Sequence, residues 1–259
     1  MRRSTAYILG FATIVCLICS VLVSSAAVML KDRQEVNKVL DRQKKVLGVA
    51  GLIEEGADTP QAEVEKLFTE RIRARVVTLE TGEYAEGVDA ATFDQRKARN
   101  DAATSTLAPP NDAKVLRLPN QAIVYQVMEG ETVKLLILPV EGKGLWSTLY
   151  GYLALAPDTN TIEGITFYEH AETPGLGGEV DNARWKALWK QRKVHGPEGR
   201  IAIEVVKGQA GPAATDPNRV DGLSGATLTS RGVSHLLQFW LGDKGWGPYL
   251  AKFKARGGA

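Results

Sequence analysis

The segment Val220-Asp221-Gly222-Leu223-Ser224-Gly225-Ala226-Thr227-Leu228-Thr229-Ser230 leads directly into the last amphipathic stretch of the chain. From Ser230 to Leu241, apolar residues recur at the i, i+3, i+4, i+7, i+8 spacing, which predicts a helix with one buried face. The small residues before this helix leave backbone N–H groups uncovered, and the start of a helix adds free N–H groups and the positive end of its dipole. These features suit a phosphate, although the Gly-Lys-[Ser/Thr] of a P-loop is absent. An ordinary Gly-rich turn followed by a Ser/Thr N-cap fits the same residues.

A second Gly-rich segment, Glu169-His170-Ala171-Glu172-Thr173-Pro174-Gly175-Leu176-Gly177-Gly178, follows a predicted strand. Pro174-Gly175 is a turn signal, and the glycines after it leave backbone amides open beside Leu176. Such a loop can lie against a flat ring system and donate hydrogen bonds along its edge. A plain hairpin or a strand–helix connection fits it equally well.

The composition of the 259-residue chain is ordinary for a globular protein, with 44% apolar and 24% charged residues. The formal charge of +2 is too small to indicate nucleic acid, and we expect no DNA or RNA partner. Both cysteines, Cys16 and Cys19, fall in the apolar N-terminal stretch, which excludes a disulfide, a Cys-ligated metal and a catalytic thiol from the remainder. His170-Ala171-Glu172 is similar to the start of a zinc deaminase signature, but the Pro-Cys-x-x-Cys half is missing, so we expect no metal site. Any hard redox chemistry would therefore come from an organic cofactor.

The N-terminal region contains no charged residue from Ala6 to Leu30. As a helix this stretch would span roughly 37 Å, enough to cross a hydrocarbon core of about 30 Å. We therefore expect a short cytoplasmic N-terminus over 1–5 and a transmembrane helix over 6–30. The alternative is a cleaved signal peptide with Ser24-Ser25-Ala26 at its cleavage site, but the apolar run exceeds the usual signal core of about 7–15 residues.

The charges that flank this span do not fix its orientation. More Lys and Arg residues follow the span than precede it, so a simple count would place the following domain in the cytoplasm. Long domains, however, often translocate regardless of such a count.

A membrane-proximal segment of helices and mixed structure is expected over 31–110, with a soft boundary near 110. A helix over 31–47 continues out of the membrane, and 48–58 breaks it. Thr59 as N-cap and Pro60 at the first helical position open a second helix. The remaining elements expected here are a strand at 75–79, a polar helix at 93–100 and a linker at 109–111.

Residues 111–259 are expected to form an α+β domain, with a curved, mostly antiparallel sheet and helices packed on it. The expected strands are 122–128, 132–139, 146–155, 161–168 and 201–206. Two helices are expected, one over 181–194 with Asp181 as its N-cap and one over 230–241. Their tryptophans favour core positions over cofactor contacts.

Asp221-Gly222-Leu223-Ser224-Gly225-Ala226-Thr227 resembles the flavinylation motif of FMN-binding domains in Na⁺-translocating NADH:quinone reductases and the related Rnf complexes. In that family the last threonine is joined to the FMN phosphate by a phosphoester, so the resemblance implies Thr227 as the attachment residue. Glu172-Thr173-Pro174-Gly175-Leu176-Gly177 resembles the second flavin loop of the family, and Gly144-Leu145-Trp146-Ser147 resembles its strand entry. A single N-terminal span followed by a long segment is similar to the C subunit of the sodium-pumping reductase rather than to the G subunit of the Rnf complex.

The resemblance also implies a set of cofactor-binding residues around the attachment site. These are Trp146, Glu172, Thr173, Gly175, Leu176, Gly177, Asp221, Ser224, Gly225, Ala226 and Thr229. Lys207 or Arg231 could neutralise the phosphate, on proximity in sequence alone. No Gly-x-Gly-x-x-Gly indicates an NADH site, and no catalytic residue is expected.

The function implied by the resemblance is electron transfer within a multi-subunit complex of the bacterial inner membrane. The chain would relay electrons from NADH toward ubiquinone, coupled to Na⁺ translocation, and a flavin transferase would load its FMN. The resemblance places the N-terminus in the cytoplasm and the flavin domain in the periplasm, against the charge count. The alternatives are an Rnf-type protein with the same flavin chemistry, a membrane-anchored flavin redox sensor and a flavin-free anchored scaffold.

Overall fold

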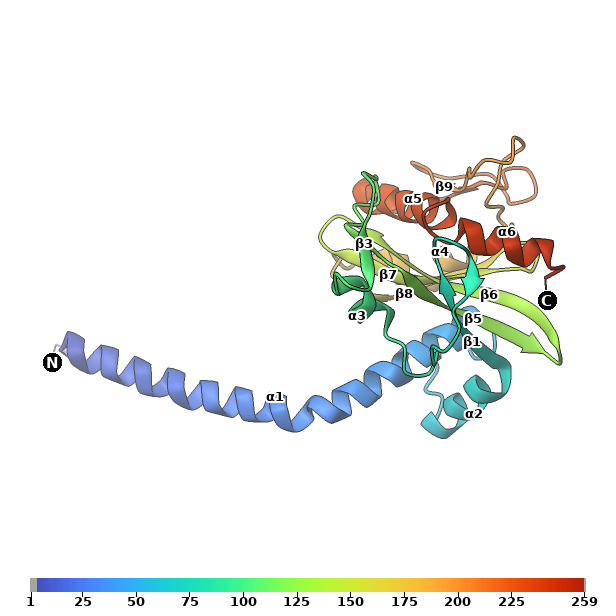
Figure 1. The fold of residues 1–259 in the computed structure, drawn as a ribbon. Helices are drawn as coiled ribbons and strands as arrows, with labels where there is room; N and C mark the ends of the chain where they lie inside the picture. The colour runs from blue at the N-terminus through green and yellow to red at the C-terminus, as the bar shows by residue number, and fades with distance from the viewer. Residues whose placement is uncertain (1–3, 259) are drawn as a thin grey trace. The chain divides into compact units, whose positions relative to one another are not determined.

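The computed structural model describes residues 4–258 and divides the chain into two compact units, which meet between Arg42 and Gln43 (Figure 1). Helix α1 (Thr5–Val49) accounts for the first unit and supplies the first residues of the second. Its part from Thr5 to Lys31 is long and apolar enough to cross a membrane, and its side chains are exposed. The single helix predicted over 6–30 and 31–47 is therefore confirmed as a helix, and it ends within two residues of the expected break at Gly48.

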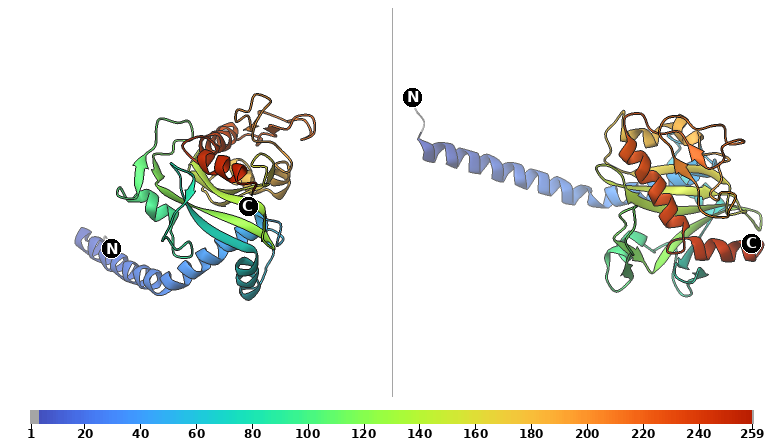
Figure 2. Two further views of the ribbon diagram at one scale, coloured as in Figure 1. Left: turned by 45° about the vertical axis from the view of Figure 1, so that its right-hand side comes forward. Right: turned by 90° about the horizontal axis from the view of Figure 1, so that it is seen from above.

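The second unit contains a six-stranded sheet in the order β2-β1-β5-β6-β7-β8, with every neighbouring pair antiparallel (Figure 2). The strands are β1 (Ile72–Thr78), β2 (Glu83–Tyr84), β5 (Gln121–Glu129), β6 (Thr132–Lys143), β7 (Thr148–Leu155) and β8 (Ile162–Glu169). The predicted α+β class with a mostly antiparallel sheet is confirmed. The boundary expected near residue 110 falls inside this unit, because β1 before it pairs with β5 after it.

Helix α5 (Thr227–Leu241) packs against β6, and α6 (Gly247–Ala255) follows it. The apolar stripe predicted for α5 is buried, and the helix begins three residues earlier than predicted. Two indole N–H groups fix these helices to one strand: Trp240 Nε1 donates to the Glu141 carbonyl at 2.7 Å and Trp246 Nε1 to the Pro139 carbonyl at 2.9 Å. Trp185, Trp189 and Trp240 are buried, which confirms the core positions predicted for the tryptophans of the two helices, and Trp246 is buried as well.

The beginning of the second unit is anchored by a partly buried ion cluster. The carboxylate of Glu55 accepts a hydrogen bond from Thr166 at 2.5 Å and pairs with Lys186 at 2.6 Å and Lys45 at 3.6 Å. Burial alone would raise the pKa of Glu55, but its bonds to Lys186 and Thr166 hold that pKa below its usual range. The last turn of α1 is thereby fixed next to β8.

The helix predicted over 181–194 is wrong in its extent. A 3₁₀ turn, η1 (Gly177–Asp181), precedes a short helix, α4 (Ala183–Ala187), whose N-cap is Asn182 and not Asp181. Farther on, Gln191 has φ +64°, and Val194 donates its N–H to the Asn160 carbonyl. The helix thus ends at Ala187, and after the left-handed Gln191 the chain runs beside the β7–β8 turn.

Smaller elements complete the second unit. They are α2 (Gln61–Arg71), α3 (Gln95–Asn100), β3 (Ser105–Leu107), β4 (Arg117–Pro119), β9 (Glu204–Val205) and β10 (Arg219–Val220). The expected linker at 109–111 lies between β3 and β4, which pair antiparallel. The strand expected over 201–206 is reduced to β9, which pairs with β10 in parallel. At α2 the N-cap is Pro60 and not Thr59, because the Pro60 carbonyl already accepts the first helical bond from Val64.

Candidate functional site

The first turn of α5 separates its hydroxyl groups into exposed and buried ones. Thr227 is the first residue of the helix and is exposed, as is Ser224 three residues before it. Thr229 is fully buried, and Ser230 is buried with its Oγ accepting the Leu223 N–H at 3.0 Å. Thr227 and Ser224 are therefore the hydroxyls of this segment that an enzyme can reach.

Glu172 ties three distant segments together at this place. Its carboxylate, 5% exposed, accepts backbone N–H bonds from Leu145 at 3.1 Å, Trp146 at 2.9 Å and Ser147 at 3.1 Å. It also accepts the Thr229 hydroxyl at 2.6 Å. The loop after β6, the loop after β8 and the start of α5 thus converge on one buried carboxylate.

Two glycines give this carboxylate its space. A Cβ on Gly144 would lie 2.6 Å from Glu172 Oε1, and a Cβ on Gly177 would lie 2.7 Å from Oε2 and 2.6 Å from Thr229 Oγ1. Side chains at these two positions would collide with the bonded pair. The glycines of both loops therefore serve close packing around Glu172.

The bonds to Glu172 also set its charge. Burial alone would raise the pKa of its carboxyl group, but the hydroxyl of Thr229 and the N–H groups of residues 145–147 outweigh that effect and lower the pKa. Glu172 is consequently ionised at neutral pH, and each of its bonds is charge-assisted.

Large apolar side chains are exposed on the same three segments. Trp146 is 66% exposed, and Leu145, Leu176 and Leu228 are also exposed. Gly225 has φ +70°, and a Cβ there would approach Leu176 Cδ2 to 2.8 Å, so the second Gly-rich loop touches the segment before α5. Leu228 directly follows Thr227, and the three segments together present exposed apolar side chains of the kind that cover a flat ring.

Thr227 lines a groove of about 950 Å³. Lys207, Arg231 and Asp221 line it. Asp221 Oδ1 accepts the Ala210 N–H at 2.9 Å, and its carbonyl accepts Trp185 Nε1 at 2.8 Å. Asp221 therefore fixes the loop that forms one wall of the groove.

Known proteins share the sequence that builds this site. The FMN-binding domain family model matches residues 144–242, from the glycine beside Glu172 to the end of α5. The C subunit of the Na⁺-translocating NADH-quinone reductase of Vibrio vulnificus is 48% identical over 96% of this chain and 95% of its own length. That of Pseudomonas aeruginosa is 46% identical over 98% and 97%. The chain belongs to the C-subunit family of these reductases.

A solved structure agrees with this assignment. The crystal structure of Shewanella oneidensis NqrC superposes with a TM-score of 0.78 at 34% identity, covering 85% of this chain and 99% of that one. As a family member, the chain is an FMN flavoprotein within an oxidoreductase complex, and its apolar N-terminal helix fits a single-pass membrane anchor.

Most of the residues named from the sequence lie on the three segments that converge on Glu172. Some of their side chains are exposed, and others are buried and bonded. Trp146, Leu176 and Thr227 face outward around the apolar surface, whereas Glu172 and Thr229 are bonded to each other beneath it. The remaining named residues lie on the same two loops: Thr173, Gly175, Gly177, Asp221, Ser224, Gly225 and Ala226.

Sequence reasoning missed Leu145 and Leu228 as exposed apolar residues next to Thr227. Leu228 stands between two threonines at the start of a helix. An isolated apolar residue in a polar segment could have indicated an exposed contact residue. The residues present fit FMN, since the exposed Thr227 lines a groove together with Lys207 and Arg231, and exposed apolar side chains lie on the segments that converge here.

Proposed function

We propose that the chain carries FMN through a phosphoester bond to Thr227 Oγ1 and relays electrons from NADH toward ubiquinone, coupled to Na⁺ translocation. The observation that supports the attachment site most is the exposure of Thr227 at the first position of α5 while Thr229 and Ser230 are buried and bonded. Attachment at a buried hydroxyl would require the Glu172 contacts to break.

The attachment is a group transfer from FAD by a flavin transferase with a divalent metal. The Thr227 hydroxyl oxygen attacks the phosphorus that bears the riboflavin moiety, and the pyrophosphate P–O bond breaks. AMP leaves with the electron pair of that bond, and the hydroxyl proton is released. Oxidation states do not change, so this step needs no redox partner.

The surroundings of Thr227 suit a phosphodiester anion. Lys207 and Arg231 line the groove next to it, and the uncompensated N–H groups of the first turn of α5 point toward its start. Arg231 lies one helical turn after Thr227, so the two side chains project from the same face of the helix.

The isoalloxazine ring is proposed to pack on the exposed side chains of Trp146, Leu176 and Leu228. Thr173 is proposed to contact the edge of the ring. Bound FMN supplies one- and two-electron redox chemistry. The chain's own contribution is to hold the attachment point, exclude water from one face of the ring and keep the loops fixed through Glu172.

The apolar part of α1 is proposed to anchor the chain in the bacterial inner membrane, with the N-terminus in the cytoplasm and the flavin domain in the periplasm. Protease added to right-side-out vesicles is then expected to remove the domain. Complete protection of the domain, with a periplasmic marker cleaved in the same vesicles, would show the opposite orientation.

Flavin fluorescence of the denatured chain in a gel tests the attachment. The full-length chain is expressed with the transferase as wild type, Thr227→Ala and Ser224→Ala. We expect a fluorescent band for wild type and Ser224→Ala and none for Thr227→Ala. Fluorescence that persists in Thr227→Ala would place the bond elsewhere, and its absence from all three, with another acceptor labelled in the same cells, would remove covalent FMN.

A further inference from the structure

The hairpin formed by β3 and β4, residues 105–119, exposes two leucines that contribute nothing to the core. Leu107 is 76% exposed and Leu116 is 79% exposed. Within the described part of the second unit, six large apolar side chains are exposed, and these two are the most exposed of them: Leu107, Leu116, Leu145, Trp146, Leu176 and Leu228. The last four belong to the proposed flavin site, which leaves the two leucines of the hairpin without a role.

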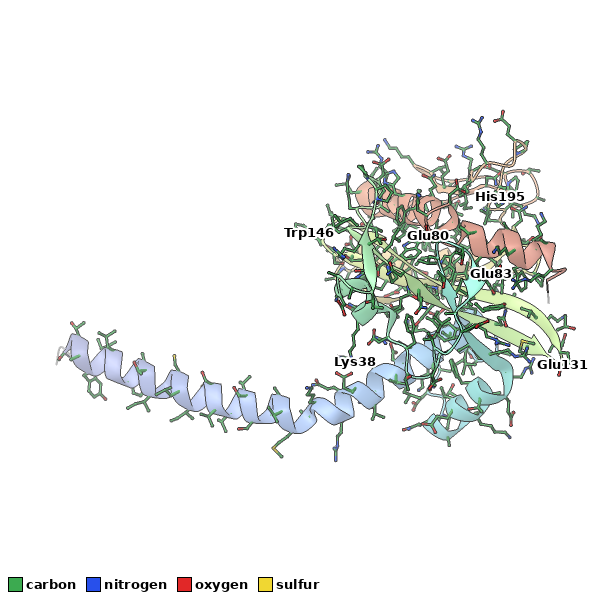
Figure 3. All side chains as sticks on the ribbon, viewed as in Figure 1. Lys38, Glu80, Glu83, Glu131, Trp146 and His195 are labelled. Atoms are coloured by element: carbon green, nitrogen blue, oxygen red, sulfur yellow. The ribbon has the colours of Figure 1, made fainter. Side chains whose placement is uncertain are left out.

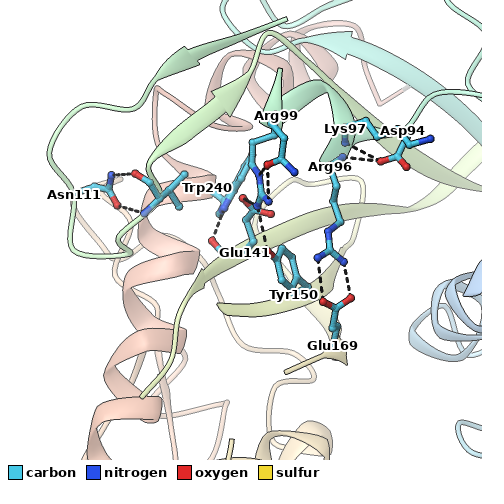
Figure 4. A network of polar contacts seen from close by, with 11 residues as sticks. Asp94, Arg96, Lys97, Arg99, Asn111, Glu141, Tyr150, Glu169 and Trp240 are labelled. Atoms are coloured by element: carbon cyan, nitrogen blue, oxygen red, sulfur yellow. Dashed lines mark hydrogen bonds and ion pairs between the residues drawn. The ribbon is translucent and has the colours of Figure 1, made fainter. Parts of the chain in front are cut away.

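Helix α3 precedes the hairpin, packs against β3 and β4, and is itself bonded to the large sheet (Figure 4). Arg96 binds both oxygens of Glu169 at 2.5 and 3.0 Å, and its guanidinium stacks on Tyr150 at 4.0 Å from the ring centre. Arg99 pairs with the buried Glu141 at 2.6 Å. A segment fixed this well at its base presents its exposed side chains at low entropic cost.

A small basic pocket of about 240 Å³ lies at the foot of the hairpin. Four cations line it, Arg99, Lys114, Arg117 and Lys143, against the one carboxylate of Glu141, so four minus one leaves a net charge of +3. Leu116 lies on the same wall. Lys114 has φ +56°, a backbone conformation that a lysine side chain disfavours and that glycine or asparagine adopts more readily. Local folding therefore gives no reason for a lysine at this position.

The basic pocket is joined to the proposed flavin site through Lys143. Its Nζ donates to the Trp146 carbonyl at 2.9 Å, and its backbone N–H donates to the Ala113 carbonyl at 2.8 Å. Lys143 thus contacts both the loop that carries Trp146 and the loop that carries Lys114.

Leu107 is the cross-strand partner of Arg117, so it projects from the opposite face of the hairpin to Leu116 and lies apart from the basic pocket. We propose that the hairpin surface, defined as Leu116 and the basic pocket, docks an acidic segment with an apolar side chain from another subunit of the same complex. The proposal rests on the proposed function, because it takes the partner to be a neighbour in electron transfer. Charge complementarity argues for this occupant: a net charge of +3 in a pocket of this size selects carboxylates, and the exposed Leu116 on its lining selects an apolar residue beside them. Docking here places the partner next to Trp146.

Photocrosslinking in the assembled complex tests the proposal. Leu116→p-benzoylphenylalanine is incorporated into the full-length chain, the purified complex is irradiated, and the adduct is mapped by mass spectrometry. The same substitution at Lys134, an exposed residue near the opposite end of β6 from Lys143, is the matched control. Lys114→Asn is then added to the Leu116 variant, since asparagine removes the charge and still suits the left-handed backbone.

The expected result is one adduct from position 116 to a segment of another subunit that contains Asp or Glu, with roughly fivefold less adduct after Lys114→Asn. Absence of an adduct at 116, an equal adduct at 134 to the same segment, or an adduct indifferent to Lys114→Asn would overturn the proposal. In-gel flavin fluorescence of the same samples reports Thr227 separately. A fluorescent band without an adduct rejects the docking surface alone, and an adduct without fluorescence rejects the attachment alone.

Discussion

Replacing Glu172 with glutamine should destabilise the flavin-binding unit while leaving its shape unchanged. If the amide oxygen takes the place of Oε1, it keeps the bonds to Trp146 and Ser147, and the amide NH₂ then faces the Leu145 N–H. A buried donor without a partner costs about 1–3 kcal/mol. The two retained bonds lose their charge assistance, roughly 0.5–1 kcal/mol each, because charge-assisted hydrogen bonds are about twice as strong as neutral ones.

The free energy of unfolding should therefore fall by about 2–5 kcal/mol at pH 7, which for a unit of this size corresponds to roughly 4–20 °C in Tm. Thermal unfolding of the full-length chain in detergent, followed by tryptophan fluorescence, measures the change. Glu131→Gln, in the exposed turn between β5 and β6, is the matched control and should leave Tm unchanged (Figure 3).

The difference between wild type and Glu172→Gln should also depend on pH in a defined direction. The pKa of Glu172 is lowered in the folded protein, so the unfolded chain binds its proton more readily. The stabilisation is therefore complete well above the ordinary carboxyl pKa of 4.5 and is lost as the pH falls through the lower folded value. A difference below about 0.5 kcal/mol at pH 7, or one that stays constant down to acid unfolding, would refute the reasoning.

Three further substitutions test separate parts of the site. Gly177→Ala should lower Tm by several degrees in a thermal melt, at a cost of roughly 1–3 kcal/mol, because its Cβ would lie 2.7 Å from Glu172 Oε2; an unchanged Tm would show that the loop relaxes freely. Leu176→Glu should shift the flavin midpoint potential or the visible spectrum, since it places a carboxylate against the ring; unchanged values of both would remove Leu176 from the ring contacts. Arg231→Ala should weaken binding of free FMN to the unmodified chain by roughly three- to tenfold in calorimetry, less so at high salt, and equal affinities would exclude Arg231 from the phosphate site.

Features of the fold that depend on short-range patterns could be predicted from the sequence. The apolar stripe of α5, the strands β5, β6 and β8 and the uncharged N-terminal helix each follow a local periodicity.

The prediction of one helix over 181–194 was wrong because the end of that helix depends on distant contacts. The buried guanidinium of Arg192 donates to the carbonyls of Leu188, Gly211 and Asp216, and the latter two belong to a loop about 20 residues farther along the chain.

In the candidate site, too, features carried by a contiguous motif could be predicted, and features that depend on residues far apart in the sequence could not. The motif ending at Thr227 is contiguous and could be identified directly. The role of Glu172 could not, because its partners at 145–147 lie 25–27 residues before it and Thr229 lies 57 residues after it. Glu172 was accordingly expected to contact the cofactor, whereas the structure places its carboxylate under the surface, where it supports the loops.

The two-residue spacing between Thr227 and Thr229 explains how one helical turn can both offer a hydroxyl for the FMN attachment and hold the helix start in place through a buried bond. Residues two apart on a helix are separated by about 200°, so their hydroxyls project from opposite sides. Thr229 therefore points inward to Glu172, and Thr227 is left exposed. A flavin bonded to Thr227 would consequently be tethered two residues from a buried, charge-assisted bond, which holds the backbone of its attachment point in place. The Glu172→Gln variant should thus broaden the distribution of ring positions even where the fluorescent band in the gel is retained, and flavin fluorescence anisotropy of the native chain would detect that loosening.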